Sequence, residues 1–298
     1  MSVLGVRATA CAKINWVLEV LRRRPDGYHE VRTVIQTVNL CDTLELEPAA
    51  ELNLESRGEG LPTAEENLVM KAARLLREQA DGLPGARMRL SKGIPVAAGL
   101  GGGSSDAAAA LRGLNELWGL GLPRETLEDV AARLGSDAPF FVRGGVALAE
   151  GRGERITPLP DTSPRELVIA LPPLSLASKT QRMYSLLTPA DYSDGSAAGR
   201  LADAIRQGKP VADERLFNVF DGPAFRAFPE LERLRRALLE AGARFVHIAG
   251  SGPALFALAG DAAKRERLTS AAAEAGARAF VVASVPAAKA LTLEVSTG

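Results

Sequence analysis

The chain has 298 residues, of which 46% are hydrophobic and 24% are charged, which is the composition of an ordinary globular protein. Its 36 basic and 36 acidic residues cancel, so nothing indicates a nucleic-acid or anionic-membrane partner, and any anion site must be local. No apolar run approaches the roughly 18 residues that span a bilayer, and the N-terminus lacks the apolar core of a secretory signal, so we expect a soluble, cytoplasmic protein.

The first 48 residues are predicted to form β-strands. Residues 43–47 alternate between polar and apolar, and residues 31–40 are rich in β-branched side chains. An amphipathic helix is predicted over Asn67 to Gln79, because apolar residues recur there at i, i+3, i+4 and i+7. A short strand near residues 88–90 then leads into a glycine cluster. Two further helices are expected over residues 104–118 and 127–134.

A proline-rich stretch over residues 158–164 is the predicted domain boundary, which gives expected domains of 1–158 and 159–298. Strands are predicted in the second domain near residues 167–171, 245–248, 254–259 and 279–285, and helices over residues 231–241 and 261–275. Helices and strands mix without regular βαβ alternation, so the sequence favours an α+β fold over a doubly wound sheet.

The two cysteines, Cys11 and Cys41, belong to neither a CxxC nor a metal-ligand pattern. So few thiols in a chain of this length are typical of a reduced, cytosolic protein. We therefore expect both to be free thiols that pack as small buried hydrophobic side chains.

The strongest functional motif is the segment Gly99-Leu100-Gly101-Gly102-Gly103-Ser104-Ser105-Asp106, which runs directly into a predicted helix. Its four glycines allow backbone N–H groups to point toward one ligand without interference from Cβ atoms. The helix N-terminus adds unpaired donors and the positive end of a dipole, so the segment predicts a phosphate-binding loop. The alternative is a flexible loop before a helix capped by serine.

This loop differs from the two commonest phosphate-binding signatures. No Gly-Lys-Ser/Thr follows it, so it is not a P-loop, and Ser104 occupies the place of the last glycine in a G-x-G-x-x-G dinucleotide motif.

Three other segments could carry chemistry, and each also has a plain structural interpretation. Residues 12–15 (Ala-Lys-Ile-Asn) with 24–30 (Arg-Pro-Asp-Gly-Tyr-His-Glu) combine a strand lysine with a turn. Residues 134–141 place Asp137 between a helix end and an apolar segment, where it could be a tuned carboxylate or only a cap. Residues 248–254 form a glycine turn that could be a plain hairpin or a second surface closing on phosphates.

In order and spacing these motifs resemble those of the GHMP kinases, a superfamily that includes galactose, homoserine, mevalonate and phosphomevalonate kinases. The combination AKINW, RRRPDGYHEV, GIPVAAGLGGGSSDAAAAL, LGSDAPFF and GSGPALFAL is most similar to the family of 4-diphosphocytidyl-2-C-methyl-D-erythritol kinases. The glycine–serine loop indicates the superfamily, and the PDGYHE segment narrows it to this family. The resemblance implies a two-domain α+β fold whose C-terminal domain is ferredoxin-like.

The resemblance also implies roles for individual residues. Lys13 and Asp137 match the catalytic pair, with Asp137 as the general base that also contacts the acceptor. Residues matching the nucleotide site are Asn67, Lys92, Gly99, Leu100, Gly101, Gly102, Gly103, Ser104 and Ser105. Residues matching the acceptor site are Asn15, Tyr28, His29, Thr180 and Tyr184.

The resemblance implies ATP with Mg²⁺ as cofactors and a small-molecule acceptor, the 2-hydroxyl of 4-diphosphocytidyl-2-C-methyl-D-erythritol, in non-mevalonate isoprenoid synthesis. The metal ligands are not identified by the motifs, and the chain is expected to be a monomer or weak homodimer. Two alternatives stay open: another GHMP small-molecule kinase of the homoserine or mevalonate type, and a non-catalytic ligand-sensing module on the same fold.

Overall fold

The computed structural model of the protein describes residues 3–58, 60–79, 82–174 and 179–298. A long hairpin of two 21-residue strands, β1 (Val3–Arg23) and β2 (His29–Ala49), forms the frame of the first sheet. This sheet has the order β12-β1-β2-β4-β3, and its other described strands are β3 (Asn53–Arg57), β4 (Gly85–Ser91), β5 (Val146–Gly151), β6 (Arg155–Pro158), β8 (Phe217–Asn218) and β12 (Leu293–Thr297).

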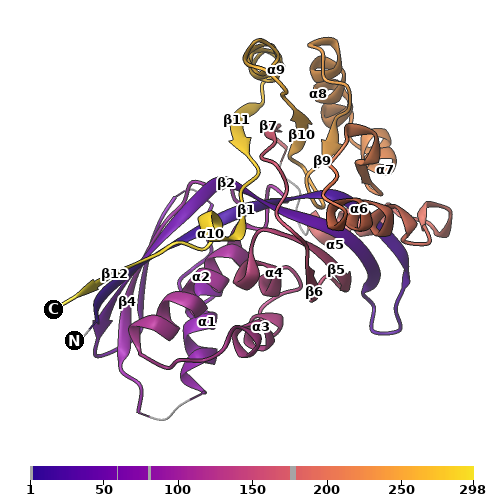
Figure 1. Cartoon of the computed structure of the whole chain (residues 1–298). Helices are drawn as coiled ribbons and strands as arrows, with labels where there is room; N and C mark the ends of the chain where they lie inside the picture. The colour runs from indigo at the N-terminus through magenta and orange to yellow at the C-terminus, as the bar shows by residue number, and fades with distance from the viewer. Residues whose placement is uncertain (1–2, 59, 80–81, 175–178) are drawn as a thin grey trace.

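Four helices pack together along the first sheet, below it in the view of Figure 1. They are α1 (Leu68–Arg77), α2 (Gly102–Leu117), α3 (Arg124–Ala132) and α4 (Ala138–Arg143). The alanine-rich face of α2 lies in the core against β1, which lets the helix approach the sheet closely. This packing fixes the N-terminus of α2, and with it the glycine loop.

The second sheet is antiparallel with the order β11-β7-β10-β9. Its strands are β7 (Glu166–Leu171), β9 (His247–Ile248), β10 (Leu255–Leu258) and β11 (Arg278–Ala283), and it packs against α8 (Pro229–Glu240) and α9 (Ala262–Glu274). Along the chain these elements follow as β7-α8-β9-β10-α9-β11, so the sheet order is fourth, first, third, second. That is the ferredoxin-like arrangement, and the predicted α+β class is confirmed.

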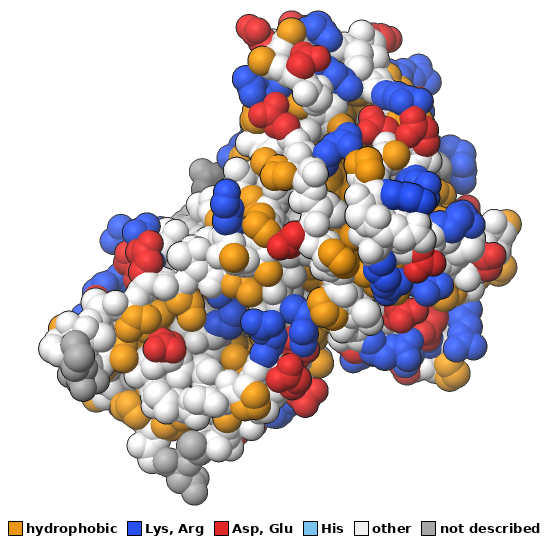
Figure 2. Space-filling model, in the orientation of Figure 1, with side chains coloured by type: hydrophobic (Ala, Val, Ile, Leu, Met, Phe, Trp, Pro, Cys, Tyr) orange, Lys and Arg blue, Asp and Glu red, His pale blue; other side chains and the backbone are white. Residues whose placement is uncertain are grey.

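The chain passes from the first sheet to the second between Pro158 and Glu166. Two strands from the second half, β8 and β12, pair with β1 and so complete the first sheet. Between the sheets lie short elements: α5 (Lys179–Ser185), α6 (Ser196–Arg206), α7 (Asp221–Ala227), α10 (Ala287–Ala290) and the 3₁₀ turns Pro189–Asp191 and Asp213–Arg215. Acidic and basic side chains are interspersed over the face drawn in Figure 2.

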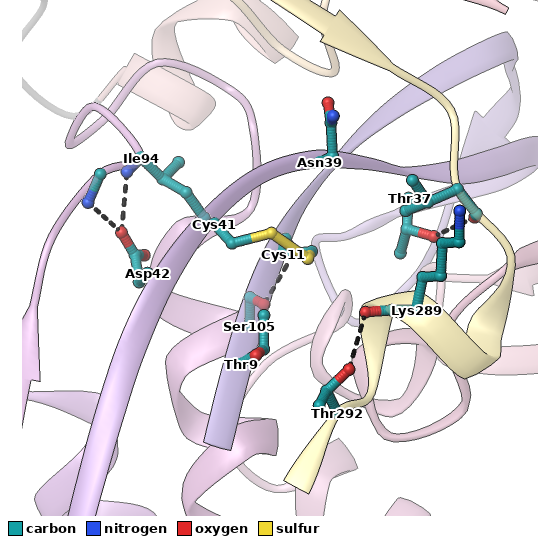
Figure 3. Close-up of a disulfide and its surroundings, with 12 residues drawn as sticks. Thr9, Cys11, Thr37, Asn39, Cys41, Asp42, Ile94, Ser105, Lys289 and Thr292 are labelled. Carbon is teal, nitrogen blue, oxygen red and sulfur yellow. Dashed lines mark hydrogen bonds between the residues drawn. A yellow bond between two sulfur atoms is a disulfide. The ribbon is translucent and has the colours of Figure 1, made fainter. Parts of the chain in front are cut away.

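The expectation of two free thiols is wrong, because Cys11 and Cys41 form a disulfide with an S–S distance of 2.11 Å. They are directly opposed on β1 and β2, with their Cα atoms 4.0 Å apart. Figure 3 shows the bond beside Asp42 and Ser105. The pairing register brings the two sulfurs together, and the spacing of the cysteines in the sequence does not reveal that register. None of the helices in the described ranges is long and apolar enough to cross a membrane.

Candidate active site

A cleft of about 1300 Å³ runs between the glycine loop, the hairpin turn of β1 and β2, and α5. Nearly all of the predicted site residues line it: Lys13, Asn15, Tyr28, His29, Asn67, Lys92, Gly99, Leu100, Gly101, Gly102, Gly103, Ser104, Asp137, Thr180 and Tyr184. Ser105 does not. Its side chain is buried and its hydroxyl donates to the Cys11 carbonyl at 2.7 Å, so Ser105 anchors α2 to β1.

The glycine loop contacts both β1 and a second glycine-containing turn, residues 248–254, which we call the second glycine segment. The Lys13 N–H donates to the Leu100 carbonyl at 3.0 Å. Gly99 and Gly101 have φ of +88° and +74°, a region that favours glycine. A Cβ at Gly99 would come within 2.2 Å of the Ala249 carbonyl oxygen, so a side chain is excluded there.

The helix α2 begins at Gly102 with Gly101 as its N-cap, two residues earlier than its predicted start. The first N–H groups of a helix have no intrahelical partner, so those at the start of α2 are available at the cleft. Asn67 caps α1 nearby, where its side-chain oxygen accepts from the Val69 N–H at 2.9 Å.

Lys13 and Asp137 come together across the floor of the cleft. The Lys13 Nζ lies 3.6 Å from Asp137 Oδ2, and it also donates to Asn15 Oδ1 at 2.8 Å. The lysine side chain is 5% exposed and the aspartate side chain 36%, so the carboxylate is the accessible member of the pair. Asp137 stands at the N-cap of α4 but makes no capping hydrogen bond, which leaves the carboxylate free to act toward the cleft.

The side chain of Asn15 is itself held by hydrogen bonds. Its amide donates to the Thr33 hydroxyl at 2.7 Å, and that hydroxyl donates to the Val17 carbonyl at 2.6 Å. The chain of bonds fixes the rotamer of Asn15, and Asn15 in turn holds the Lys13 ammonium beside Asp137.

The second glycine segment closes over Lys13. A Cβ at Gly250 would come within 2.6 Å of Lys13 Nζ, so only glycine allows this approach. Asn218 donates to the carbonyls of Ile248 and Gly250, and Asp221 accepts from the Ile248 N–H at 2.9 Å and contacts His247. These two polar residues hold this segment in place.

A buried ion cluster lies under the glycine loop. The Lys92 ammonium contacts Asp42 and donates to Asp106 Oδ2 at 2.6 Å. Burial raises the pKa of the Asp106 carboxyl to about 8; the Lys92 charge opposes this rise and the Asp42 carboxylate adds to it. Asp106 Oδ1 is buried without a hydrogen-bond partner among the described residues. Asp42 and Asp106 therefore fix Lys92 at the edge of the cleft.

Aromatic side chains gather at the other end of the cleft. The Tyr28 ring is 53% exposed, and the Arg152 guanidinium lies 4.9 Å from its centroid. His29 stacks on Tyr184 with centroids 4.7 Å apart, and Tyr184 meets Phe220 edge-on at 5.0 Å. Burial, with a further contribution from Arg23, lowers the pKa of His29, so the imidazole is neutral near pH 7.

Tyr184 lies in this aromatic group, on a face of the cleft, and burial followed by the Asp137 charge raises its phenolic pKa. Its hydroxyl therefore stays protonated at any physiological pH. Sequence reasoning missed Lys179, Arg152 and Asp42, which also shape the cleft or its edge. None of the three stands in a periodic or glycine-rich motif, so the sequence holds no signal for them.

Two family models match the chain: the GHMP kinases N terminal domain over residues 67–145 and the GHMP kinases C terminal domain over residues 196–278. A relative from Dehalococcoides mccartyi named 4-diphosphocytidyl-2-C-methyl-D-erythritol kinase is 42% identical over 93% of this chain and 97% of its own length. A relative of the same name from Symbiobacterium thermophilum is 47% identical over 84% of this chain and 89% of its own.

Solved structures give the same grouping. A crystal structure of 4-(cytidine 5'-diphospho)-2C-methyl-D-erythritol kinase superposes with a TM-score of 0.77 at 37% identity, covering 94% of this chain and 99% of that one. Homoserine kinase from Cytophaga hutchinsonii superposes with a TM-score of 0.73 at 18% identity, covering 99% of this chain and 98% of its own, which shows a shared fold.

Proposed function

The chain belongs to the 4-diphosphocytidyl-2-C-methyl-D-erythritol kinases of the GHMP kinase family, and on this premise we propose that it transfers the γ-phosphate of ATP to the 2-hydroxyl of 4-diphosphocytidyl-2-C-methyl-D-erythritol. This places it in the non-mevalonate (methylerythritol phosphate) route to isoprenoids. The observation that carries the proposal is the Lys13–Asp137 pair, at 3.6 Å, between a glycine loop on one side and an aromatic group on the other.

The nucleotide half of the cleft is assigned to ATP. The glycine loop and the start of α2 offer backbone N–H groups to the phosphates, and Lys92 adds a fixed positive charge. Asn67 lies at the same end of the cleft, where it would line the adenosine pocket.

Magnesium accompanies ATP in most kinases and is held by one or two carboxylates together with the phosphates and water. The residues here fit that mode: Asp106 lines the cleft and its buried Oδ1 has no hydrogen-bond partner within the described ranges. Those ranges contain no cluster of three or more His, Cys, Asp or Glu side chains that would hold a metal without the nucleotide. The ion, when bound, would neutralise charge on the phosphates.

The other half of the cleft is assigned to the cytidine end of the acceptor. The exposed Tyr28 ring offers a face for stacking, and the neutral His29 imidazole can hydrogen-bond the edge of a base. Asn15, Thr180 and Tyr184 line the same cleft, and we assign them to the rest of the acceptor.

The proposed phosphoryl transfer takes place where the two halves of the cleft meet. Asp137 accepts the proton of the acceptor hydroxyl as that oxygen attacks the γ-phosphorus of ATP. The bond between the γ-phosphorus and the bridging β–γ oxygen breaks, and ADP leaves with that oxygen. Lys13 holds the carboxylate in place and balances negative charge on the group in transfer.

An acceptor panel tests the proposal. The diphosphocytidyl compound, homoserine, mevalonate and galactose are each offered with ATP and magnesium, and ADP release is measured. Turnover with the diphosphocytidyl compound at least 100-fold above the others is expected. Turnover with homoserine or mevalonate instead would assign another GHMP activity, and binding without any turnover would identify a sensing module.

A further inference from the structure

Lys179 is the first residue of α5, and its side chain lines the cleft. The helix is held over the second glycine segment at two points. The Thr180 hydroxyl lies 3.5 Å from the Ser251 hydroxyl. The buried side chain of Met183 lies beside Gly252, where a Cβ on the glycine would be 3.9 Å from it. Because a Cβ at Gly250 in the same segment would come within 2.6 Å of Lys13 Nζ, these contacts place the start of α5 near the Lys13 end of the cleft.

The charged groups that face Lys179 are Lys13 on β1 and Asp137 before α4. Burial, and then the positive charge of Lys13, lower the pKa of Lys179 to about 8, while Asp137 acts in the opposite direction. On its own helix, Arg182 points elsewhere, with its guanidinium 5.5 Å from the Phe228 ring centroid. Within the described part of the chain, no carboxylate forms an ion pair with Lys179.

Two ammonium groups, those of Lys13 and Lys179, therefore line the same cleft as the Asp137 carboxylate. Lys13 and Lys179 together carry more positive charge than Asp137 cancels, and the half-buried setting of Lys179 makes that excess costly without a ligand. Lys92 is not counted with them, because it is held in the separate buried cluster with Asp42 and Asp106. The unbalanced charge lies where the acceptor hydroxyl and the γ-phosphate would meet, and a multiply charged anion is the ligand that would balance it.

We propose that Lys179 is a further catalytic residue, whose ammonium contacts the non-bridging oxygens of the phosphoryl group during its transfer. The inference rests on the proposed kinase function and adds to it a residue that no motif identified. Lys179 donates hydrogen bonds and charge and keeps its own proton, so it forms no covalent bond and needs no co-reactant. A charge placed at the moving group lowers the barrier more than it strengthens ground-state binding.

Steady-state kinetics of Lys179→Met and Lys179→Arg test this role, with Lys209→Met on the surface as the matched control. Lys179→Met should lower kcat about 10²-fold, with both KM values within about threefold of wild type. Arginine stays protonated, so Lys179→Arg should keep more activity. Wild-type kcat/KM is expected to fall as pH rises through about 8, and Lys179→Arg should lose that fall. Circular dichroism and the thermal midpoint check that each variant folds.

A second measurement does not depend on the acceptor. If Lys179 meets the γ-phosphate, ATP binding raises its pKa, so calorimetry at pH 8 in two buffers should detect proton uptake with ATP and less with ADP. Lys179→Met should abolish that difference.

Three results overturn the assignment: unchanged kcat in Lys179→Met, a raised acceptor KM at wild-type kcat, or equal proton uptake in variant and wild type. Failure of the proposed function would give a different result. The wild-type enzyme would not turn over the diphosphocytidyl acceptor, while its proton uptake on binding ATP would persist.

Discussion

The side-chain amide of Asn218 donates to the carbonyl oxygen of Gly250 at 2.8 Å. Asn218 lies on β8, which pairs with β1 beside Leu18. Gly250 lies so near Lys13, on the same β1, that a Cβ at Gly250 would come within 2.6 Å of Lys13 Nζ. One strand therefore carries Lys13, the proposed catalytic lysine, and through β8 positions the backbone segment that closes over it. This couples the second half of the chain to the first at the reacting centre.

Replacing Asn218 by Leu keeps the size of the side chain but removes both donors from buried carbonyls. Each unpaired buried acceptor costs about 1–3 kcal/mol, so the free energy of unfolding should fall by about 2–6 kcal/mol and kcat should fall with it. Urea denaturation and steady-state kinetics measure the two effects, and Asn53→Leu on exposed β3 is the control. Wild-type stability in Asn218→Leu would contradict the role given to this amide.

Asp137→Asn keeps the shape of the side chain and removes the proton acceptor. We expect kcat to fall by about 10²–10⁴-fold, while ATP affinity from calorimetry stays near that of wild type. Because the variant also removes the ion-pair partner of the buried Lys13, circular dichroism and the thermal midpoint check that it still folds. Asp203→Asn, on the surface of α6, controls for a general loss of charge. Activity within a few-fold of wild type would reduce Asp137 to a turn residue.

Gly103→Val separates nucleotide binding from folding. Gly103 is exposed at the second position of α2, and a Cβ there would meet only Leu68, at an ordinary 3.5 Å. The protein should therefore fold, but the branched side chain would occupy the space that the phosphates need, so ATP affinity should fall at least tenfold. Gly222→Val, at the second position of α7, is the matched control for helix propensity. Equal ATP affinity in the two variants would exclude the loop as the nucleotide site.

The Cys11–Cys41 bond closes a loop with a sequence separation of 30 residues. Constraint of the unfolded chain by such a loop contributes about 3–4 kcal/mol. The double variant Cys11→Ala, Cys41→Ala should lose stability of that order in denaturant titrations. Thiol titration of unfolded wild type should find no free thiol until a reductant is added. Two free thiols without reductant would contradict the disulfide.

Local pattern predicted much of this fold, because periodicity and glycine report directly on backbone conformation. The helices of residues 67–79, 231–241 and 261–275 match α1, α8 and α9 within a few residues. Local sequence pattern could not predict which distant segments pair with one another. Neither the register that opposes Cys11 to Cys41 nor the packing of α5 that brings Lys179 to Lys13 has a sequence period. The Lys13–Asp137 pairing came from family resemblance, since spacing alone cannot show that two residues so far apart meet.

The aromatic end of the cleft gives the sharpest test of which acceptor is used. One face of the Tyr28 ring is covered by the Arg152 guanidinium, and the ring is more than half exposed, which leaves room for a base to stack. Base–aromatic stacking is worth about 1–3 kcal/mol. Tyr28→Ala should therefore weaken binding of the diphosphocytidyl acceptor about 5- to 150-fold at unchanged ATP affinity, whereas Tyr28→Phe, which keeps the ring, should bind it like wild type.

His29 makes the complementary prediction, because it would read the edge of the base that Tyr28 stacks on. Its ring already rests on Tyr184, and its neutral imidazole can give or accept one hydrogen bond, worth about 0.5–1.5 kcal/mol. In the double variant Tyr28→Ala, His29→Ala the preference for a cytosine over a uracil acceptor should disappear, since the C4 amino group is no longer recognised. Competition between the two acceptors, followed by product analysis, measures that preference. A double variant that still prefers cytosine, with wild-type acceptor affinity, would leave this chain a GHMP kinase whose acceptor binds elsewhere in the cleft.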